Sequence, residues 1–349
     1  MSGVTHQIGG GGRELVTALA LDPTLAWAAA RRALLTGAGP SVPVDATAAL
    51  ATLARLGGRL VAIDDPEFPA VLRALTTGPV GLFVRGALPA GPALGIVGAR
   101  ACTRAAARLA HDLAATAVRE GMTVVSGGAL GIDAAAHEGA IAAGGTTVAV
   151  LGSGLDRPYP ARNLALFDRI AGSGAVATPF PPGTPPSREN FPRRNVIVAA
   201  LAERVVVVEA RGRSGALITA RAARAAGRPV AAVPGTVGCD RLLADGARRI
   251  ESPQDLSAWL RGEAPRPAAV HAPTPEAEAA LGACDAEPRS VADIAARAGL
   301  TEDDARTALA FLELWGLVVQ ARLQHYVRII EVPGATPTDP SRTHDEALV

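Results

Sequence analysis

Short glycine-bearing segments recur in the middle of the chain, each at or soon after the end of an apolar run that we expect to be a β-strand. They are the segments 98–100 (GAR), 126–131 (SGGALG), 152–154 (GSG) and 213–215 (RSG). In an open parallel sheet, ligands bind beyond the carboxyl ends of the strands, where helix N-termini offer free N–H groups. One such segment alone fits a tight turn equally well, because glycine permits sharp bends. Their recurrence at successive strand ends favours a shared anion-binding edge.

A second candidate for chemistry is the run FPRRN at residues 191–195, which follows a proline-rich loop. Arg193 and Arg194 could each bind phosphate through paired hydrogen bonds, and Phe191 could stack on an unpaired base. The structural alternative is a solvated charged turn in which Asn195 caps the following helix. We interpret the run as a clamp for single-stranded nucleic acid.

The acidic and sulfur-bearing residues provide no clear catalytic or metal site. Asp133 and His137 stand four apart on one predicted helical face, and without an apparent third ligand we interpret the pair as structural. Glu209 ends an apolar run and would face the same sheet edge, where it could orient Arg100 or a loop amide. The three cysteines are too widely spaced for a zinc site or a disulfide framework. We therefore predict no catalytic residue, no metal and no cofactor.

Charge is distributed unevenly along the chain. The net charge is +1, from 34 basic and 33 acidic residues, and every basic residue is an arginine. Residues 92–250 hold 19 of these arginines against 11 acids, so this segment carries +8 and the remainder −7. Arginine is a planar fork suited to phosphate. The absence of lysine excludes a Walker motif, and no G-x-G-x-x-G opens the first helix of the segment. The distribution points to a polyanionic partner.

Short apolar runs alternate with amphipathic segments from residue 94 onward, a pattern typical of parallel strands joined by helices. We expect strands at 94–99, 122–126, 146–151, 175–178, 204–209 and 230–233. We expect helices at 103–120, 132–143, 161–170, 195–201 and 215–226. The predicted fold class is α/β, an extended Rossmann-like doubly wound parallel sheet with a small N-terminal helical region and a C-terminal winged helix.

Composition divides the chain into five predicted parts: a helical region 1–62, the sheet domain 63–260, a proline- and alanine-rich linker 261–275, a winged-helix domain 276–332 and a disordered tail 333–349. Within the sheet domain, residues 81–84 are expected to form a short edge strand. The winged helix is predicted from helices at 275–284, 290–298 and 301–315 and a hairpin of 317–322 with 325–330. Its third helix carries mostly acids, which favours protein contact over groove binding.

No apolar run approaches the roughly 18 residues that a membrane helix needs, and the N-terminus lacks the pattern of a secretory signal. We therefore expect a soluble protein of the cytoplasm without a membrane partner.

Ordered motifs across residues 68–250 resemble the DNA-processing protein A family (DprA, also called Smf). They are IVGAR at 96–100, VSGGALGID at 125–133, YP at 159–160, FPRRN at 191–195, VEA at 208–210, SGALIT at 214–219 and VPG at 233–235. The resemblance implies a non-enzymatic homodimer that binds and protects incoming single-stranded DNA and loads the RecA recombinase in natural transformation. By position, it assigns DNA binding to Arg100, Ser126, Gly127, Gly128, Phe191, Arg193, Arg194, Asn195, Ser214 and Gly215.

Two departures from the family pattern concern arginines. Leu130 and Val196 stand where the family usually or often has arginine, so two phosphate contacts are expected to be missing, with Arg211, Arg213 and Arg241 as possible replacements. Two other functions remain open at this point. One is a Rossmann-fold nucleotide-binding or nucleotide-hydrolysing enzyme using Glu209 or Asp133. The other is a transcription regulator acting through the winged helix.

Overall fold

A computed structural model of the chain describes residues 10–23, 25–40, 42–212, 214–263, 274–285, 287–314, 317–322 and 325–328. The chain divides into two compact units, Met1–Pro265 and Arg266–Val349, each considered by itself. Arg213, most of the predicted linker and the predicted tail 333–349 lie outside the described residues.

The first unit is built on one mixed sheet, which contains nine strands within the described residues, in the order β1-β2-β6-β5-β4-β3-β7-β8-β9. The pairs from β6 to β9 are parallel, whereas β2 runs antiparallel to both β1 and β6. The strands are β1 (Gly58–Ala62), β2 (Gly81–Gly86), β3 (Ala93–Val97), β4 (Thr123–Ser126), β5 (Thr147–Val150), β6 (Ala175–Thr178), β7 (Arg204–Val207), β8 (Val230–Ala232) and β9 (Arg248–Arg249). The predicted doubly wound, mostly parallel sheet is confirmed.

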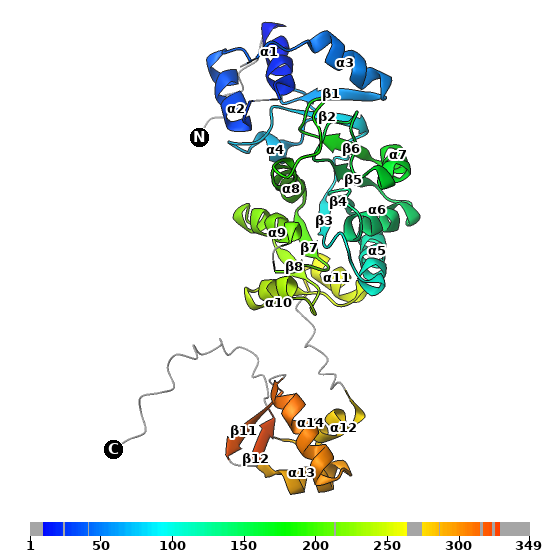
Figure 1. Cartoon of the computed structure of the whole chain (residues 1–349), viewed down its shortest axis with the longest axis vertical. Helices are drawn as coiled ribbons and strands as arrows, with labels where there is room; N and C mark the ends of the chain where they lie inside the picture. Colours follow the sequence, from blue (N-terminus) through cyan, green and yellow to red (C-terminus); the bar gives the residue numbers. More distant parts are fainter. Residues whose placement is uncertain are drawn as a thin grey trace, which may run out of the picture. The chain divides into compact units, whose positions relative to one another are not determined.

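Helices cover both faces of this sheet (Figure 1). One face carries α5 (Arg104–Arg119), α6 (Ile132–Ala142), α7 (Leu164–Ser173) and α11 (Pro253–Leu260), and the other carries α8 (Asn190–Leu201), α9 (Gly215–Ala225) and α10 (Val237–Ala244). Successive residues of a strand point to opposite faces. In β3, Ile96 therefore packs with the cluster beneath α5 and α6, and Val97 packs with that beneath α8 and α9. Because both faces are buried there, the central strands from β3 to β8 are largely apolar, whereas the outer strands β1 and β9 carry arginines.

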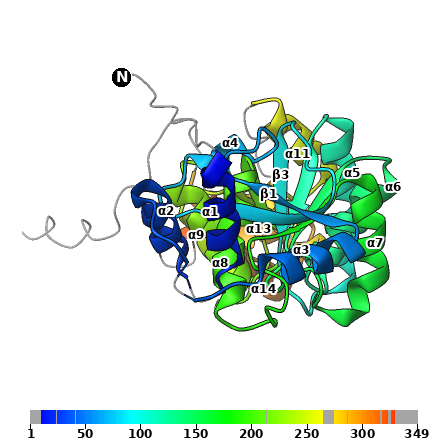
Figure 2. The same ribbon diagram turned by 90° about the horizontal axis from the view of Figure 1, so that it is seen from above.

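The N-terminal helices α1 (Gly10–Leu21), α2 (Trp27–Thr36) and α3 (Ala46–Arg55) lie together at the β1 and β2 end of the sheet (Figure 1). Figure 2 looks down on these three helices. Val16 and Leu19 share a core cluster with Leu82 and Val84 of β2. The Arg31 guanidinium donates to the carbonyls of residues 72, 73, 78 and 79, around the short helix α4 (Ala70–Arg73). The expectation that residues 81–84 form an edge strand is wrong, because β1 pairs with the outer side of β2 and β6 with its inner side.

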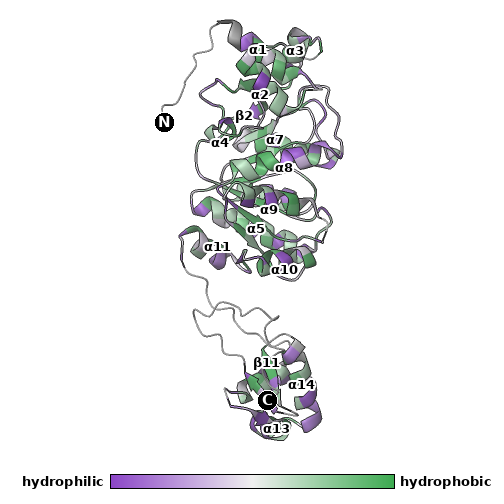
Figure 3. Ribbon diagram, turned by 90° about the vertical axis from the view of Figure 1, so that its left-hand side faces the viewer, coloured by the Kyte–Doolittle hydropathy of each residue, from purple (hydrophilic) through white to green (hydrophobic). Residues whose placement is uncertain are grey.

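The second unit holds α12 (Pro275–Ala283), α13 (Val291–Ala298) and α14 (Glu302–Leu314), together with a small sheet in the order β10-β12-β11. Its strands are β10 (Arg289–Ser290), β11 (Val318–Arg322) and β12 (His325–Arg328). Thr301 caps α14, since its hydroxyl accepts from the Asp304 amide at 3.2 Å and donates to the Asp304 carboxylate at 2.7 Å. Figure 3 shows hydrophilic stretches, in purple, along α13 and α14. The predicted three helices and hairpin are confirmed.

Among the described residues of both units, no helix combines the length and the apolar character that crossing a bilayer requires.

Candidate functional site

A cavity of about 360 Å³, here called the strand-end cavity, opens at the carboxyl ends of β3 and β4, beside the N-terminus of α9, the helix that follows β7. The chain order of the strands reverses here, because β3 lies between β4 on one side and β7 on the other. Such a switch point is where open α/β sheets bind ligands. Its lining includes these predicted site residues: Arg100, Gly127, Phe191, Arg194, Asn195, Ser214 and Gly215. Ser126, Gly128 and Arg193 are not part of that lining.

An aromatic and cationic stack stands at the cavity wall. The Arg100 guanidinium lies over the Phe191 ring, with its carbon 4.7 Å from the ring centroid. Tyr159 packs on Phe191 with centroids 5.9 Å apart and rings tilted by 45°. A Cβ on Gly152 would lie 2.8 Å from the Phe191 ring, so glycine is needed for this close approach. The stack leaves Tyr159 exposed and Phe191 half-buried, so both rings remain partly open to a ligand.

Tyr159 and Arg188 are functional candidates that the predicted site omits. Arg188 is exposed and lines the strand-end cavity, and Tyr159 lines a smaller cavity of about 30 Å³ that shares Phe191 and Arg100 with it. The signal for Tyr159 was present in the sequence, because YP at 159–160 is one of the motifs that carry the family resemblance. Arg188 carried no such signal beyond its place between the proline-rich loop and Phe191.

Buried charges hold the glycine loop, residues 126–131, from two sides. The Arg194 guanidinium donates to the carbonyls of Gly127 and Val150, the latter at 2.6 Å. The Asp133 carboxylate accepts from the amides of Gly127 at 3.1 Å and Ala129 at 3.3 Å. A Cβ on Gly127 would lie 2.6 Å from this carboxylate, which explains the glycine. Burial lowers the pKa of Arg194 to about 10 and raises the pKa of Asp133.

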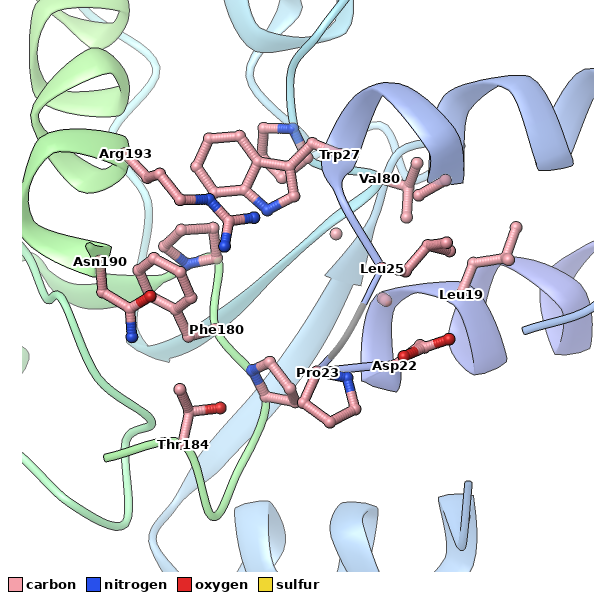
Figure 4. Close-up of a pocket in the computed structure, with 16 residues that line it drawn as sticks. Leu19, Asp22, Pro23, Leu25, Trp27, Val80, Phe180, Thr184, Asn190 and Arg193 are labelled. Atoms are coloured by element: carbon pink, nitrogen blue, oxygen red, sulfur yellow. The ribbon is translucent and has the colours of Figure 1, made fainter. Parts of the chain in front are cut away.

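The predicted clamp of two adjacent arginines does not form. Helix α8 begins at Asn190, five residues earlier than predicted, so consecutive residues point about 100° apart around its axis. Arg194 turns inward and is 4 % exposed, whereas Arg193 points to the rings of Trp27 and Phe180 on another side of the helix (Figure 4). Asn195 is likewise inside the helix rather than its N-cap, and its amide donates to the Gly215 carbonyl at 3.1 Å.

Two further predicted site residues shape the loop rather than line the cavity. The Ser126 side chain is fully buried and its hydroxyl donates to the Ile96 carbonyl at 2.6 Å. Gly128 has a φ of 67°, and its carbonyl accepts from the Asn163 amide at 3.0 Å. A φ in this region favours glycine over residues that carry a Cβ.

The end of helix α9 contributes backbone donors to the same cavity. Ser214 caps the helix, since its hydroxyl accepts from the Ala216 amide at 3.3 Å, and Ser214, Gly215 and Ala216 all line the cavity. Backbone N–H groups at a helix N-terminus attract anions. Together with Arg100 and Arg188, they make the strand-end cavity suited to a phosphate group.

The remaining titratable candidates, Glu209 and His137, make structural contacts. The Glu209 carboxylate accepts from the Thr103 amide at 3.0 Å and from the Thr103 hydroxyl at 3.2 Å. Glu209 therefore orients a loop amide, as predicted. His137 Nδ1 lies 2.7 Å from the Thr147 hydroxyl, which itself donates to the Val124 carbonyl. Burial lowers the pKa of His137 to about 3. Across the described residues, no group of three or more His, Cys, Asp or Glu side chains could hold a metal ion.

Family models match both units of the chain. The model described as DNA recombination-mediator protein A matches residues 59–261, and the DprA winged helix domain matches residues 264–322. The chain belongs to the DprA family. A putative DNA processing protein DprA from Mycobacterium tuberculosis is 41 % identical over 299 residues, covering 77 % of this chain and 76 % of that protein. Protein Smf from Escherichia coli is 36 % identical over 281 residues, covering 74 % of each.

Solved structures of DprA proteins are similar to this chain. An X-ray structure of DprA from Streptococcus pneumoniae has a TM-score of 0.58 at 32 % identity, covering 71 % of this chain and 94 % of that one. A DprA structure from Helicobacter pylori has a TM-score of 0.53 at 26 % identity, covering 59 % and 97 %. The Helicobacter pylori structure gives insight into the single-stranded DNA binding mode of that protein.

Proposed function

We propose that this DprA-family protein binds single-stranded DNA at the strand-end cavity. The observation that carries the proposal is the stack of Arg100, Phe191 and Tyr159 beside the capped N-terminus of α9. Rings that remain partly open can stack on bases, while a guanidinium and helix N–H groups can bind the adjacent phosphates. Single-stranded DNA binding by the Helicobacter pylori relative supports the same ligand class.

The geometry favours an unpaired strand over a duplex. In a duplex each base has both faces covered by its neighbours, so a base must leave the stack before it can pack on Phe191. Unstacking a base costs less free energy in a single strand than in a duplex. Bases would therefore pack against Phe191 and Tyr159, with Arg100 and Arg188 on the phosphates.

In this proposal nine of the ten predicted site residues have one of two roles. Arg100, Phe191, Asn195, Ser214 and Gly215 contact DNA, because they line the cavity with side chains or backbone groups open to it. Arg194, Ser126, Gly127 and Gly128 set the shape of the glycine loop. Arg193 belongs to neither group, because it packs on Trp27 and Phe180 away from the cavity.

The nucleotide-enzyme alternative receives less support from the same geometry. It needs Asp133 or Glu209 as a free acid or base, but each carboxylate accepts two hydrogen bonds from groups that it holds in place. Glu209 is also absent from the lining of the strand-end cavity. We therefore propose that the chain acts by binding rather than catalysis.

The proposal extends to partners that fit a recombination mediator. The matching family model is described as a DNA recombination-mediator protein. We propose that a homodimer of this chain protects incoming single strands and loads a RecA-type recombinase on them in the cytoplasm during natural transformation or recombination. A RecA strand-exchange assay on DNA coated with single-strand-binding protein tests this step. Stimulation by the chain supports it, and no change contradicts it.

An arginine substitution tests DNA binding at the cavity. Arg100→Gln removes one exposed cation, and we expect the affinity for a labelled oligothymidine to fall about tenfold, since a charge-assisted hydrogen bond contributes about 1.5 kcal/mol or more. Arg228→Gln is the matched control, because Arg228 precedes β8 at the opposite edge of the sheet. Fluorescence anisotropy measures both. Equal affinities for the two variants would contradict the proposed site.

A further inference from the structure

Arg193 lies between two aromatic rings that come from distant parts of the chain. Its guanidinium carbon is 4.6 Å from the Trp27 ring centroid and 5.3 Å from the Phe180 ring centroid. The two rings are themselves 6.1 Å apart and tilted by 40°. Figure 4 shows the guanidinium of Arg193 beside both rings. A cation over an aromatic face is attracted to it, and more strongly when water is excluded.

This contact joins two elements that otherwise belong to different parts of the first unit. Trp27 is the first residue of α2, among the N-terminal helices, and Arg193 is in the first turn of α8. Phe180 follows β6 and is buried. A small cavity, here called the Arg193 cavity, is lined on one side by Leu19 and Trp27 and on the other by Asn190 and Arg193 of α8. The first turn of α8 therefore packs against the N-terminal helices.

The same turn of α8 also carries the ring at the proposed DNA site. Phe191 and Asn195, four residues apart, share one face of the helix and line the strand-end cavity. Arg194 fixes a second face through the glycine loop, and Arg193 fixes a third through Trp27 and Phe180. The rotation and position of α8 thus depend on the contacts of Arg194 with the glycine loop and on those of Arg193 with Trp27 and Phe180.

We propose that Arg193 is a positioning residue, through which Trp27 of the N-terminal helices holds α8 so that Phe191 meets DNA. The inference rests on the proposed function, since it concerns how the same site is kept in order. It assigns to the N-terminal helices a part in DNA affinity although none of their described residues lines the strand-end cavity.

Substitutions at Trp27 test the inference in the full chain. Trp27→Leu removes the ring, and we expect the affinity for oligothymidine to fall about three- to tenfold, the range that corresponds to a cation–π contact. Trp27→Phe retains a ring and should restore most of the affinity. Leu34→Ala is the matched control, because Leu34 packs into the core from the same helix without lining the Arg193 cavity. Circular dichroism melting shows that each variant folds.

A double-variant cycle separates the contact from general destabilisation. If Arg193 and Trp27 act through one another, Trp27→Leu with Arg193→Met should weaken binding no more than the weaker-binding single variant. Additive losses would overturn the inference, as would an unchanged affinity of Trp27→Leu or an equal loss in Leu34→Ala.

Fluorescence of Trp27 supplies a readout that a purely structural role would not move. The chain has three tryptophans, so Trp259→Phe with Trp315→Phe leaves Trp27 as the only reporter. We expect its emission to change on addition of oligothymidine with the same midpoint as the anisotropy. No change at saturation would overturn the inference while leaving the proposed function standing. Absence of DNA binding by the unmodified chain would instead refute the proposed function, and this inference with it.

Discussion

At the scale of single residues, Arg194 and Asp133 matter because they hold Gly127 of the glycine loop from opposite sides, at its carbonyl and at its N–H. Asp133 accepts from the Gly127 amide and Arg194 donates to the Gly127 carbonyl. Both side chains are almost fully buried. The burial of Arg194 could not be predicted, because arginine is seldom buried and its carbonyl partners lie 44 and 67 residues away in the sequence.

Removing the buried cation should destabilise the fold. Arg194→Met leaves Asp133 buried without its opposite charge and two carbonyls without a donor, so we expect the free energy of unfolding to fall by about 3–5 kcal/mol. Adding Asp133→Asn should recover part of this loss, because an amide oxygen still accepts from the Gly127 N–H. Urea unfolding followed by circular dichroism measures both variants. Unchanged stability of Arg194→Met would contradict this role.

Leu130 provides a gain-of-function prediction. It lines the smaller cavity beside Tyr159 and Phe191. The family resemblance implies an arginine at this position. Leu130→Arg adds a cation there, so we expect tighter oligothymidine binding and a salt dependence steeper by about 0.7 in log–log slope. Leu35→Arg is the control, because Leu35 is 87 % exposed on α2 and does not line either cavity at the site. An equal gain in both variants would indicate a non-specific charge effect.

At the scale of elements, the strands β3 to β8 could be predicted to within two residues because each is a short apolar run bounded by glycine, proline or polar residues. The start of α8 could not, since Pro192 is typical of a helix break and yet lies in the first turn, where its missing N–H costs no hydrogen bond. Because the helix begins five residues earlier, Arg193 and Arg194 both lie within it and their side chains point to different sides. Strand β1 was missed because it follows directly on a helical pattern.

The packing of α6 against β5 predicts a pH dependence of stability. The pKa of His137 falls from 6.5 to about 3 on folding, because burial disfavours its charged form. Between these values the unfolded chain binds a proton that the folded chain does not, so stability falls as the pH falls. When the pH is lowered from 7 to 5, we expect the free energy of unfolding of His137→Gln to fall by about 2 kcal/mol less than that of the unmodified chain.

Urea unfolding at the two pH values measures this difference. Asp133 contributes with the opposite sign, because its raised pKa favours the folded state as the pH falls, but it is present in both proteins and cancels in the comparison. Identical pH profiles for the two proteins would contradict a neutral buried His137.

At the scale of the whole molecule, the near-neutral net charge conceals an uneven distribution. The segment 92–250 that forms the strand-end cavity carries an excess of arginine, and the remainder carries an excess of acid. In the second unit, α14 opens with Glu302, Asp303 and Asp304, which would repel phosphates. Protein contact through this helix stays a prediction, whereas the winged-helix fold itself was predictable from three helical segments, the last opened by Thr301, and a hairpin.

Binding of unpaired DNA in the strand-end cavity is best tested by a salt series that compares oligothymidine with a duplex of equal length. We predict tighter binding of the single strand at every salt concentration, with a log–log slope of about −0.7 for each phosphate contact. Arg100→Gln should reduce the magnitude of that slope by about one contact. Equal or tighter binding of the duplex, or no binding of the single strand at low salt, would show that the cavity does not take unpaired DNA.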